Sequence, residues 1–326
     1  MNQHLDPATA PNGVLIAIDG QGHDLENPYA QHQDRAWIWI HLSQRSEVAR
    51  RWILKESGIP PHEARALVAE HTRPRCTQYD NGLLFIGRGV NMDPESTPED
   101  MVSIRAWIDE KRIVSVVLRR LRSAEAVADE FGSESPPSSP QAVLSRLMHH
   151  MVDRIGPVVE DLAEKLEDIQ EDVIDDNTPT LHASALSPIR LSTIGLYRYL
   201  VPMHDAASAL VSSPTLANSS DVVTELVATR DRLARLTEEL NAIETRAGVT
   251  RDEIVSRRAE ELNDRVYALT ILAGVFLPLS VITGLLGMNV DGIPLSSNPA
   301  GFWITTISLV VLLVISLTLL RMKRWI

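Results

Sequence analysis

One uncharged run near the C-terminus constrains the fold of this chain more than any other feature. Residues 266–286, which read VYALTILAGVFLPLSVITGLL, contain no Asp, Glu, Lys or Arg. At a rise of about 1.5 Å per residue they would form a helix about 31 Å long, which matches the hydrocarbon thickness of a bilayer. Thr270, Gly274, Ser280 and Gly284 fall on one side of this helix. The run therefore predicts a membrane span with a close helix contact or a watered cavity on that side.

A second uncharged run, residues 302–320, predicts a second membrane helix. Basic residues follow this run and precede the first one, whereas the connecting loop, residues 287–301, contains no Lys or Arg. These basic residues are Arg257, Arg258, Arg265, Arg321, Lys323 and Arg324. Because basic residues stay on the cytoplasmic side, we expect both termini in the cytoplasm, the loop outside and residues 321–326 as a cytoplasmic tail.

Charge is distributed unevenly along the 326 residues. The net charge is −12, but the charged residues after position 266 sum to +2, which leaves −14 for residues 1–265. An acidic soluble part disfavours nucleic acid and anionic lipid as its partners and favours cations. Cys76 is the single cysteine, which excludes an intrachain disulfide, and the N-terminus contains no apolar run typical of a signal sequence. We therefore expect residues 1–265 to be cytoplasmic.

The N-terminal part of the chain, residues 1–135, predicts a cytoplasmic α/β domain, because short apolar, β-branched runs alternate with helical patterns. The candidate strands are residues 14–19, 36–42, 83–90, 102–108 and 112–118. The candidate helices are residues 46–56, 62–70 and 122–130. A Ser- and Pro-rich linker, residues 133–140, follows this domain.

Helical patterns dominate the rest of the soluble chain. Residues 136–220 predict a cytoplasmic helical region, with one long helix over 141–176 and another over 186–212. Residues 221–265 predict a stalk helix that continues without a break into the first span, since no proline interrupts it. Apolar residues recur along the stalk at heptad spacing. They are Leu226, Leu233, Leu236, Leu240, Ile243, Ala247 and Ile254. We expect this stripe to pack on partner helices, most simply those of other copies of the chain.

The tripeptide Gly287-Met288-Asn289 closes the first of the two C-terminal spans. With a long stalk before it, a short loop after it and a basic C-terminal end, this arrangement resembles the CorA superfamily of divalent-cation transporters. The resemblance implies a transporter rather than an enzyme, without a bound cofactor, in the bacterial inner membrane. It further implies a funnel-shaped homopentamer whose first-span helices surround a central pore in the lipid bilayer.

The loop after the tripeptide distinguishes branches of that superfamily. Residues 290–294 read VDGIP, which resembles the ZntB-like zinc transporters with their Gly-Ile/Met-Pro element. Leu295 departs from that pattern, because such chains often carry Gly there. The resemblance implies Zn²⁺ as the transported ion, with Mg²⁺, Co²⁺, Ni²⁺ and Cd²⁺ as further candidates. A CorA-like magnesium or cobalt channel remains the alternative.

A column of first-span residues would line the pore if several copies met. Steps of three or four back from Asn289 give Gly284, Ser280, Leu277, Ala273, Thr270, Val266 and Asn263. This column offers oxygen atoms and aliphatic collars but no His, Cys, Asp or Glu, so it contains no dedicated zinc cage. We expect a hydrated cation to pass, and we expect Asn289 and Asp291 to meet it at the outer mouth.

Several simpler interpretations stay open. Asn289 could be a helix C-cap, and the polar stripe could serve helix packing alone. The acidic run at 160–176 could concentrate cations or could be a solvated helix face. The chain could also be a membrane-anchored enzyme or sensor, which predicts a nucleophile–base pair or a phosphate loop in residues 1–135. No GxSxG, HExxH or glycine-rich phosphate loop occurs there.

Overall fold

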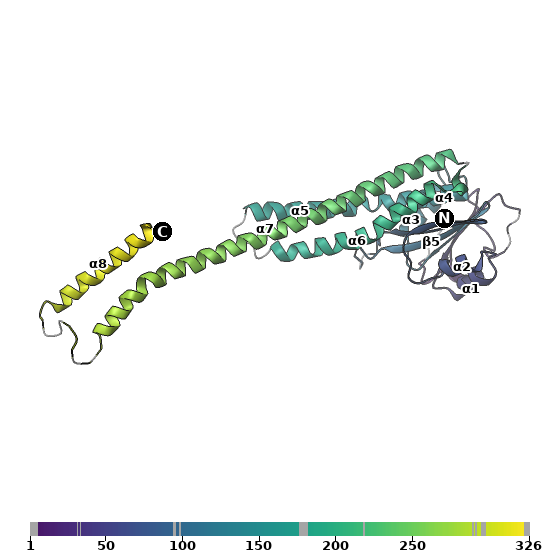
Figure 1. The fold of residues 1–326 in the computed structure, drawn as a ribbon. Helices are drawn as coiled ribbons and strands as arrows, with labels where there is room; N and C mark the ends of the chain where they lie inside the picture. The colour runs from purple at the N-terminus through teal and green to yellow at the C-terminus, as the bar shows by residue number, and fades with distance from the viewer. Residues whose placement is uncertain are drawn as a thin grey trace. The chain divides into compact units, whose positions relative to one another are not determined.

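The computed structural model describes residues 6–30, 32, 34–93, 96–97, 99–175, 182–217, 219–288, 290, 292–294 and 298–322. The chain divides into two compact units, Met1–Arg251 and Asp252–Ile326. Figure 1 traces the order of the elements within each unit.

A six-stranded mixed sheet forms the centre of the first unit, with strand order β1-β2-β6-β5-β4-β3. Its strands are β1 (Val14–Asp19), β2 (Ile38–Ser43), β3 (Arg75–Tyr79), β4 (Gly82–Gly89), β5 (Val102–Ile108) and β6 (Arg112–Val117). β2 and β6 run parallel, whereas the other neighbouring strands are antiparallel. All five predicted strands are confirmed to within two residues at each end.

The edge strand β3 was not predicted. Its sequence, RCTQY, contains no apolar run, and its residues are half-buried or exposed. β3 pairs antiparallel with β4, with Tyr79 opposite Gly82 across a two-residue turn. Pairing with a buried neighbour, which propensity alone does not reveal, makes this polar segment a strand.

Helices cover both faces of the sheet, as the α/β prediction required (Figure 1). One face packs against α1 (Glu47–Lys55) and α2 (Pro61–Leu67), around a core that includes Ile40, Trp52 and Trp107. On the other face lie α3 (Arg122–Glu130) and α4 (Pro140–Asp153). There Trp39 stacks on Phe131 with ring centroids 6.3 Å apart. Alternation along β2 separates Trp39 from Ile40, because successive strand residues point to opposite faces.

Long helices complete the first unit. They are α5 (Gly156–Asp175), α6 (His182–Val211) and the N-terminal part of α7 (Ser220–Leu286), with short 3₁₀ turns at Pro11–Gly13 and Pro214–Leu216. The predicted single helix over 141–176 was wrong, because the chain turns between α4 and α5. Pro157 explains the break, since it has no N–H to donate to the carbonyl of Asp153, as a continuous helix would require, whereas proline is tolerated in the first turn of a new helix such as α5.

The heptad stripe of the stalk is buried within a single chain, so its predicted pairing with other copies was wrong. Leu233, Leu240 and Ile243 have no exposed surface. Helices of the same chain lie alongside α7, as three polar contacts demonstrate. Asp153 of α4 accepts a hydrogen bond from Arg232 at 2.5 Å, Gln170 of α5 donates to Thr250 at 2.9 Å, and Arg190 of α6 pairs with Glu244 at 2.8 Å.

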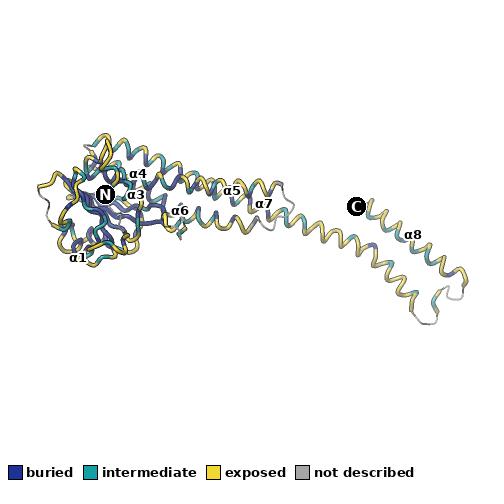
Figure 2. The backbone as a smooth tube through the Cα atoms, turned by 180° about the vertical axis from the view of Figure 1, so that it is seen from behind, coloured by how far each residue is buried: buried dark blue, intermediate teal, exposed yellow. Residues whose placement is uncertain are grey.

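The second unit contains the C-terminal part of α7 and α8 (Gly301–Met322). α7 runs without a break to Leu286, which confirms the predicted continuous helix. α8 begins one residue before the predicted second span and ends two residues after it. Most of this unit is exposed (Figure 2), although it is the most apolar part of the chain.

Candidate cation pathway

Two helices, α7 and α8, are long and apolar enough to cross a membrane. Almost none of the most apolar stretch of either helix is buried within the chain. A core helix of a soluble protein would bury this surface, because exposing so many large apolar side chains to water is costly. The apolar side chains of these two helices therefore need to be covered, either by lipid or by further copies of the chain.

The predicted pore column lies on an exposed side of α7. All seven of its residues are exposed, including Thr270 and Leu277. The least exposed position of the span is Val275, which is 6% exposed. Five residues at about 100° each place Val275 about 140° around the helix from Thr270. The column therefore keeps a face that is free for contact with other copies or with water.

Hydroxyl groups on this helix are bonded to its own backbone. Thr270 donates to the carbonyl of Val266 at 2.8 Å, and Thr283 donates to the carbonyl of Leu279 at 3.0 Å. Pro278 leaves the carbonyl of Gly274 without its usual helical donor, and the Thr283 hydroxyl lies too far along the helix to replace it. Thr270 can still accept a hydrogen bond from water through its oxygen lone pairs.

The helix ends where the Gly-Met-Asn tripeptide begins. Gly287 donates its N–H to the carbonyl of Thr283 at 2.9 Å, which completes the last helical turn. Met288 is exposed. Asn289 and Asp291, the predicted residues of the outer mouth, lie outside the described residues, as do Leu295 and the basic residues Lys323 and Arg324.

Charged residues cluster on α7 just before the first apolar run. Arg257 pairs with Glu253 at 2.6 Å and Arg265 pairs with Glu261 at 3.6 Å, both one turn apart on the same helix. Such exposed pairs contribute only about 0.3–0.5 kcal/mol each. Glu260 and Asp264 are exposed on the same stretch of α7. They can therefore add negative potential at this end of the span.

The acidic run of α5 forms a solvated face. Leu162, Leu166 and Ile169 point into the helical core, whereas the acidic residues between them are exposed. Lys165 pairs with Asp161 at 2.7 Å. Among the described residues, no group of three or more His, Cys, Asp or Glu side chains is arranged to hold a metal ion. The predicted alternative of a solvated helix face agrees with this arrangement.

One Ser–His pair does occur in the α/β domain, and sequence patterns did not reveal it. Ser115 Oγ lies 2.7 Å from His41 Nδ1 and also accepts a hydrogen bond from Trp39 Nε1 at 2.9 Å. His41 is 3% exposed, and burial lowers its pKa to about 3. A buried neutral imidazole that no substrate can reach gives the pair a structural role in the sheet, not that of an active site.

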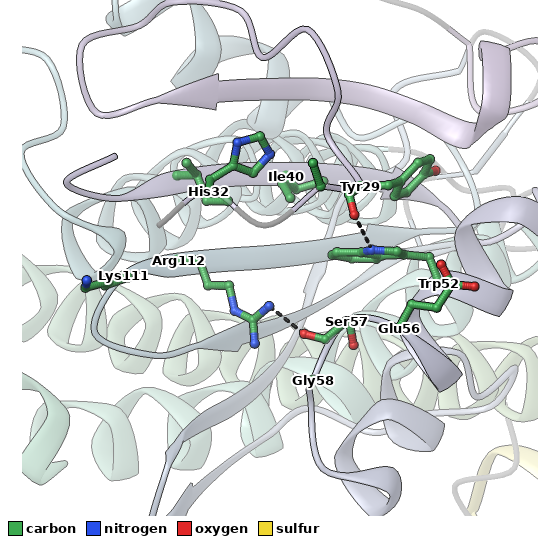
Figure 3. A pocket seen from close by; sticks show the side chains of 11 residues that line it. Tyr29, His32, Ile40, Trp52, Glu56, Ser57, Gly58, Lys111 and Arg112 are labelled. Atoms are coloured by element: carbon green, nitrogen blue, oxygen red, sulfur yellow. Dashed lines mark hydrogen bonds between the residues drawn. The ribbon is translucent and has the colours of Figure 1, made fainter. Parts of the chain in front are cut away.

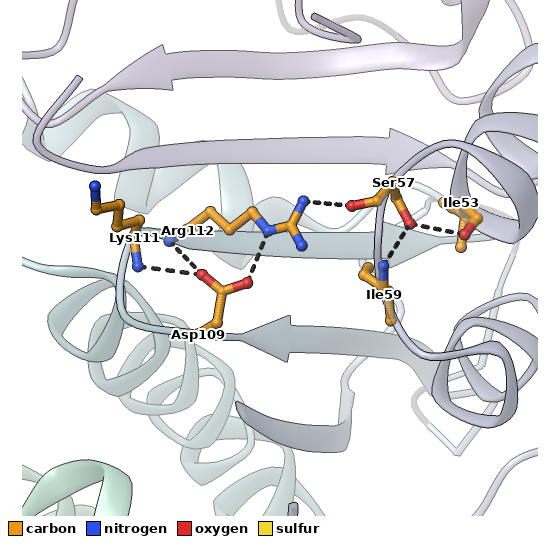
Figure 4. Close-up of polar contacts among 6 residues, drawn as sticks. All are labelled: Ile53, Ser57, Ile59, Asp109, Lys111 and Arg112. Atoms are coloured by element: carbon orange, nitrogen blue, oxygen red, sulfur yellow. Dashed lines mark hydrogen bonds and ion pairs between the residues drawn. The ribbon is translucent and has the colours of Figure 1, made fainter. Parts of the chain in front are cut away.

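A pocket of about 310 Å³ opens beside β2 and α1 (Figure 3). Trp52 forms part of its wall and donates a hydrogen bond to the carbonyl of Tyr29 at 3.0 Å. Arg112 reaches the rim, where Asp109 binds it at 2.7 Å and the carbonyl of Ser57 accepts a hydrogen bond from it at 2.6 Å (Figure 4). The charge of this arginine is thus already neutralised within the domain.

Comparisons with known proteins identify the family. The model of the "CorA-like Mg2+ transporter protein" family matches residues 34–324. The "Divalent cation transporter CmaX" of Pseudomonas aeruginosa is 32% identical over 292 residues, which cover 88% of this chain and 87% of that protein. The "Zinc transport protein ZntB" of Pectobacterium carotovorum is 30% identical over 287 residues, with the same coverage. The structure of full-length CmaX superposes with a TM-score of 0.82 at 29% identity, covering 98% of this chain and all of that one. This chain therefore belongs to the CorA-like Mg²⁺ transporter family.

Proposed function

We propose that this protein transports divalent metal cations across the bacterial inner membrane, through a central pore that α7 helices from several copies enclose. Membership of a transporter family supports transport rather than catalysis. The observation that carries the pore assignment is the exposed column on α7, which combines polar oxygens with small residues on a helix that can span a bilayer. A helix used only as an anchor would need no such column.

The side chains of the column suit a cation that keeps much of its hydration shell. Asn263, Thr270 and Ser280 provide oxygen dipoles at intervals along the helix, and Gly284 permits close approach of backbone carbonyls. Val266 and Leu277 would form aliphatic collars that gate the pore by narrowing or dewetting it. Without imidazole, thiolate or carboxylate groups on the column, the ion would not be held tightly inside the pore.

Selection of the ion would then take place at the pore mouths. A ring of Asn289 side chains would hydrogen-bond the water shell of an arriving cation, and a ring of Asp291 carboxylates would raise its local concentration. With a membrane potential of 100 mV, negative inside, entry of a divalent cation would be favoured by about 4.6 kcal/mol. The VDGIP loop and the 30% identity to ZntB support Zn²⁺ as the principal ion.

The proposed assembly is a homopentamer with both termini and the α/β domain in the cytoplasm. Basic residues before the first span and after the second support this orientation. The proposed boundaries are 1–135 for the α/β domain, 136–220 for the helical region, 221–265 for the stalk and 266–326 for the membrane domain. The stalk stripe is buried within one chain, so it cannot form the contacts between copies. Those contacts would instead come from the membrane helices and the exposed faces of the soluble unit.

Flux measurements in reconstituted vesicles test the pore-mouth assignment. Asn289→Ala should reduce uptake of Zn²⁺ by tenfold or more, because the ring that meets the hydrated ion would be lost. The matched control in the same loop is Asn298→Ser, which keeps an oxygen that can accept the hydrogen bond from the N–H of Ala300 and should leave uptake unchanged. Equal uptake by wild-type protein and Asn289→Ala would remove Asn289 from the pathway.

A CorA-like magnesium or cobalt channel is the second candidate. The description of the matching family as Mg²⁺ transporters favours it. Competition between ions in the same vesicles separates the two candidates. Mg²⁺ at equal concentration should leave Zn²⁺ uptake almost unchanged if the pore selects zinc, and should suppress it if the pore is of the magnesium type.

A further inference from the structure

A basic pocket lies where α6 approaches the sheet, far along the sequence from the membrane helices. Its volume is about 360 Å³, near the lower end of the range for small-molecule sites. The residues that line it are His71, Thr72, Arg73, Arg88, Arg198 and Tyr199. Three arginines and a histidine thus meet without a carboxylate in the lining, in a soluble part whose net charge is −14. This local reversal of charge points to an anionic ligand.

Arg88 of β4 forms the floor of this basic pocket. Its two terminal nitrogens donate to backbone carbonyls, of Met101 at 3.0 Å and of Thr72 at 2.9 Å. Its Nε is buried and has no hydrogen-bond partner among the described residues. Burial is the largest cause that lowers the pKa of Arg88; the charges of Arg198 and Arg119 lower it further, whereas Tyr199 and Asp100 raise it. Backbone carbonyls orient the side chain but supply no counter-charge.

A second arginine, Arg105 of β5, adds buried positive charge behind the first. Arg105 pairs in register with Ile86, two residues before Arg88 on β4, so both arginines project from the same face of the sheet. Arg105 is 1% exposed and donates to the carbonyl of Ala69 at 2.7 Å, while its Nε and Nη1 have no partner among the described residues. Burial, followed by the charge of Arg88, lowers the pKa of Arg105 to about 10.

The opposite wall of the pocket comes from α6. The guanidinium carbons of Arg88 and Arg198 lie 4.5 Å and 4.8 Å from the centroid of the Tyr199 ring. Arg198 also donates a hydrogen bond to the Tyr199 hydroxyl. Cation–π contacts of this kind attract each guanidinium to the ring, but they leave both positive charges in place. Tyr199 therefore holds two arginines together that would otherwise repel each other.

Neighbouring carboxylates do not neutralise the cluster. Asp100 attracts Arg88, but it is bound to Arg119 at 2.7 Å, and Arg119 and Arg198 both repel Arg88. Glu99 lies near Gly195 of α6, yet it forms no ion pair with the residues that the structure describes, and its Oε2 is buried without a partner. The carboxylates that the structure describes around the basic pocket thus offset only part of its positive charge.

We propose that the basic pocket binds a phosphate group, either as inorganic phosphate or as part of a small phosphorylated molecule. Arginine suits this role, because its planar fork donates two parallel hydrogen bonds to a phosphate. The exposed side chains of Arg73 and Arg198 would close on the anion from the segment after α2 and from α6, above the floor that Arg88 provides. Bound phosphate would therefore tie α6 to the sheet and the segment that precedes β3.

Calorimetric titration of the full-length protein in detergent with sodium phosphate, at constant ionic strength, tests this proposal. We expect saturable binding with a dissociation constant in the millimolar range or tighter, and at least a tenfold loss of affinity in the double variant Arg73→Gln/Arg198→Gln. The matched control is Arg51→Gln, which removes an exposed arginine of α1 and should bind phosphate as the wild type does. Both altered arginines of the pocket are exposed, so the fold should tolerate their loss.

Thermal unfolding provides a second readout. Phosphate should raise the Tm of the wild type and of Arg51→Gln in a saturable way, compared with chloride at equal ionic strength. General exclusion of phosphate from protein surfaces also raises Tm, but that effect is not saturable and would persist in the double variant. Titration with methyl phosphate and adenosine monophosphate distinguishes the sources. Tighter binding of an ester would identify a phosphorylated molecule as the ligand, and tighter binding of the free ion would identify inorganic phosphate.

The proposal is wrong if wild-type protein binds none of these three probes, or if the double variant binds them equally well. A change in oligomeric state of the double variant, with no saturable phosphate binding by the wild type, would instead assign the basic pocket to contacts between copies. None of these outcomes depends on cation transport, which can be measured separately in the same preparations.

Discussion

The buried His41–Ser115 pair should make the stability of the α/β domain depend on pH. Burial lowers the pKa of His41 from an ordinary value near 6.5 to about 3. The unfolded chain therefore binds a proton below about pH 6.5, whereas the folded domain resists it until about pH 3. Stability from this histidine is fully present above pH 6.5 and is lost as the pH falls. The loss amounts to about 1.4 kcal/mol per pH unit, or about 3 kcal/mol between pH 6.5 and 4.5.

Urea denaturation of the full-length protein in detergent, followed by tryptophan fluorescence at several pH values, measures this effect. His41→Gln keeps a group that can accept from Ser115 but removes the titration, so the free energy of unfolding should fall less steeply with acid than in the wild type. The matched control is His62→Gln, which removes a histidine whose side chain is 76% exposed and leaves the buried His41–Ser115 pair intact. Equal pH slopes for wild type and His41→Gln would refute the reasoning.

Three further predictions follow from the same structure. Leu240→Ala, in the buried stripe of α7, should lower the free energy of unfolding by about 2–5 kcal/mol, whereas Leu191→Ala at an exposed position of α6 should change it by less than about 0.5 kcal/mol in urea denaturation. Leu277→Ala should raise basal divalent flux in vesicles by widening a collar of the proposed pore, with Leu272→Ala on the other side of the helix as the unaffected control. Asp291→Asn should weaken apparent cation affinity in flux assays at low ionic strength, and an equal loss at high salt would indicate direct ligation instead.

Local patterns in the sequence predicted most of the soluble fold. β1 and β5 were predicted to the residue, because their apolar, β-branched runs end at Asp or at a turn. The edge strand β3 escaped prediction, since its polar residues acquire strand structure only by pairing with β4. The turn between α4 and α5 was also missed, although Gly156-Pro157 provided a local signal for it. The helical periodicity of residues 141–176 on both sides of this dipeptide suggested one continuous helix instead.

The candidate site was predictable in part. The uncharged run, residues 266–286, and the stalk segment before it, with apolar residues at heptad spacing, together predicted one continuous helix. α7 confirms this helix. The sequence could not show whether the stalk stripe packs on helices of the same chain or of another copy, because heptad spacing is the same in both cases. The basic pocket could not be found from sequence, since Arg73, Arg88 and Arg198 lie on separate elements that only the fold brings together.

The most direct test of divalent-cation transport is an ion-flux assay on the purified protein in sealed vesicles. Uptake of Zn²⁺, Mg²⁺, Co²⁺, Ni²⁺ and Cd²⁺ is measured in competition, with and without a pH gradient. We predict saturable divalent uptake, with Zn²⁺ the most effective competitor, that increases when the vesicle interior is made electrically negative. Absence of flux for all five ions under every gradient would contradict the account.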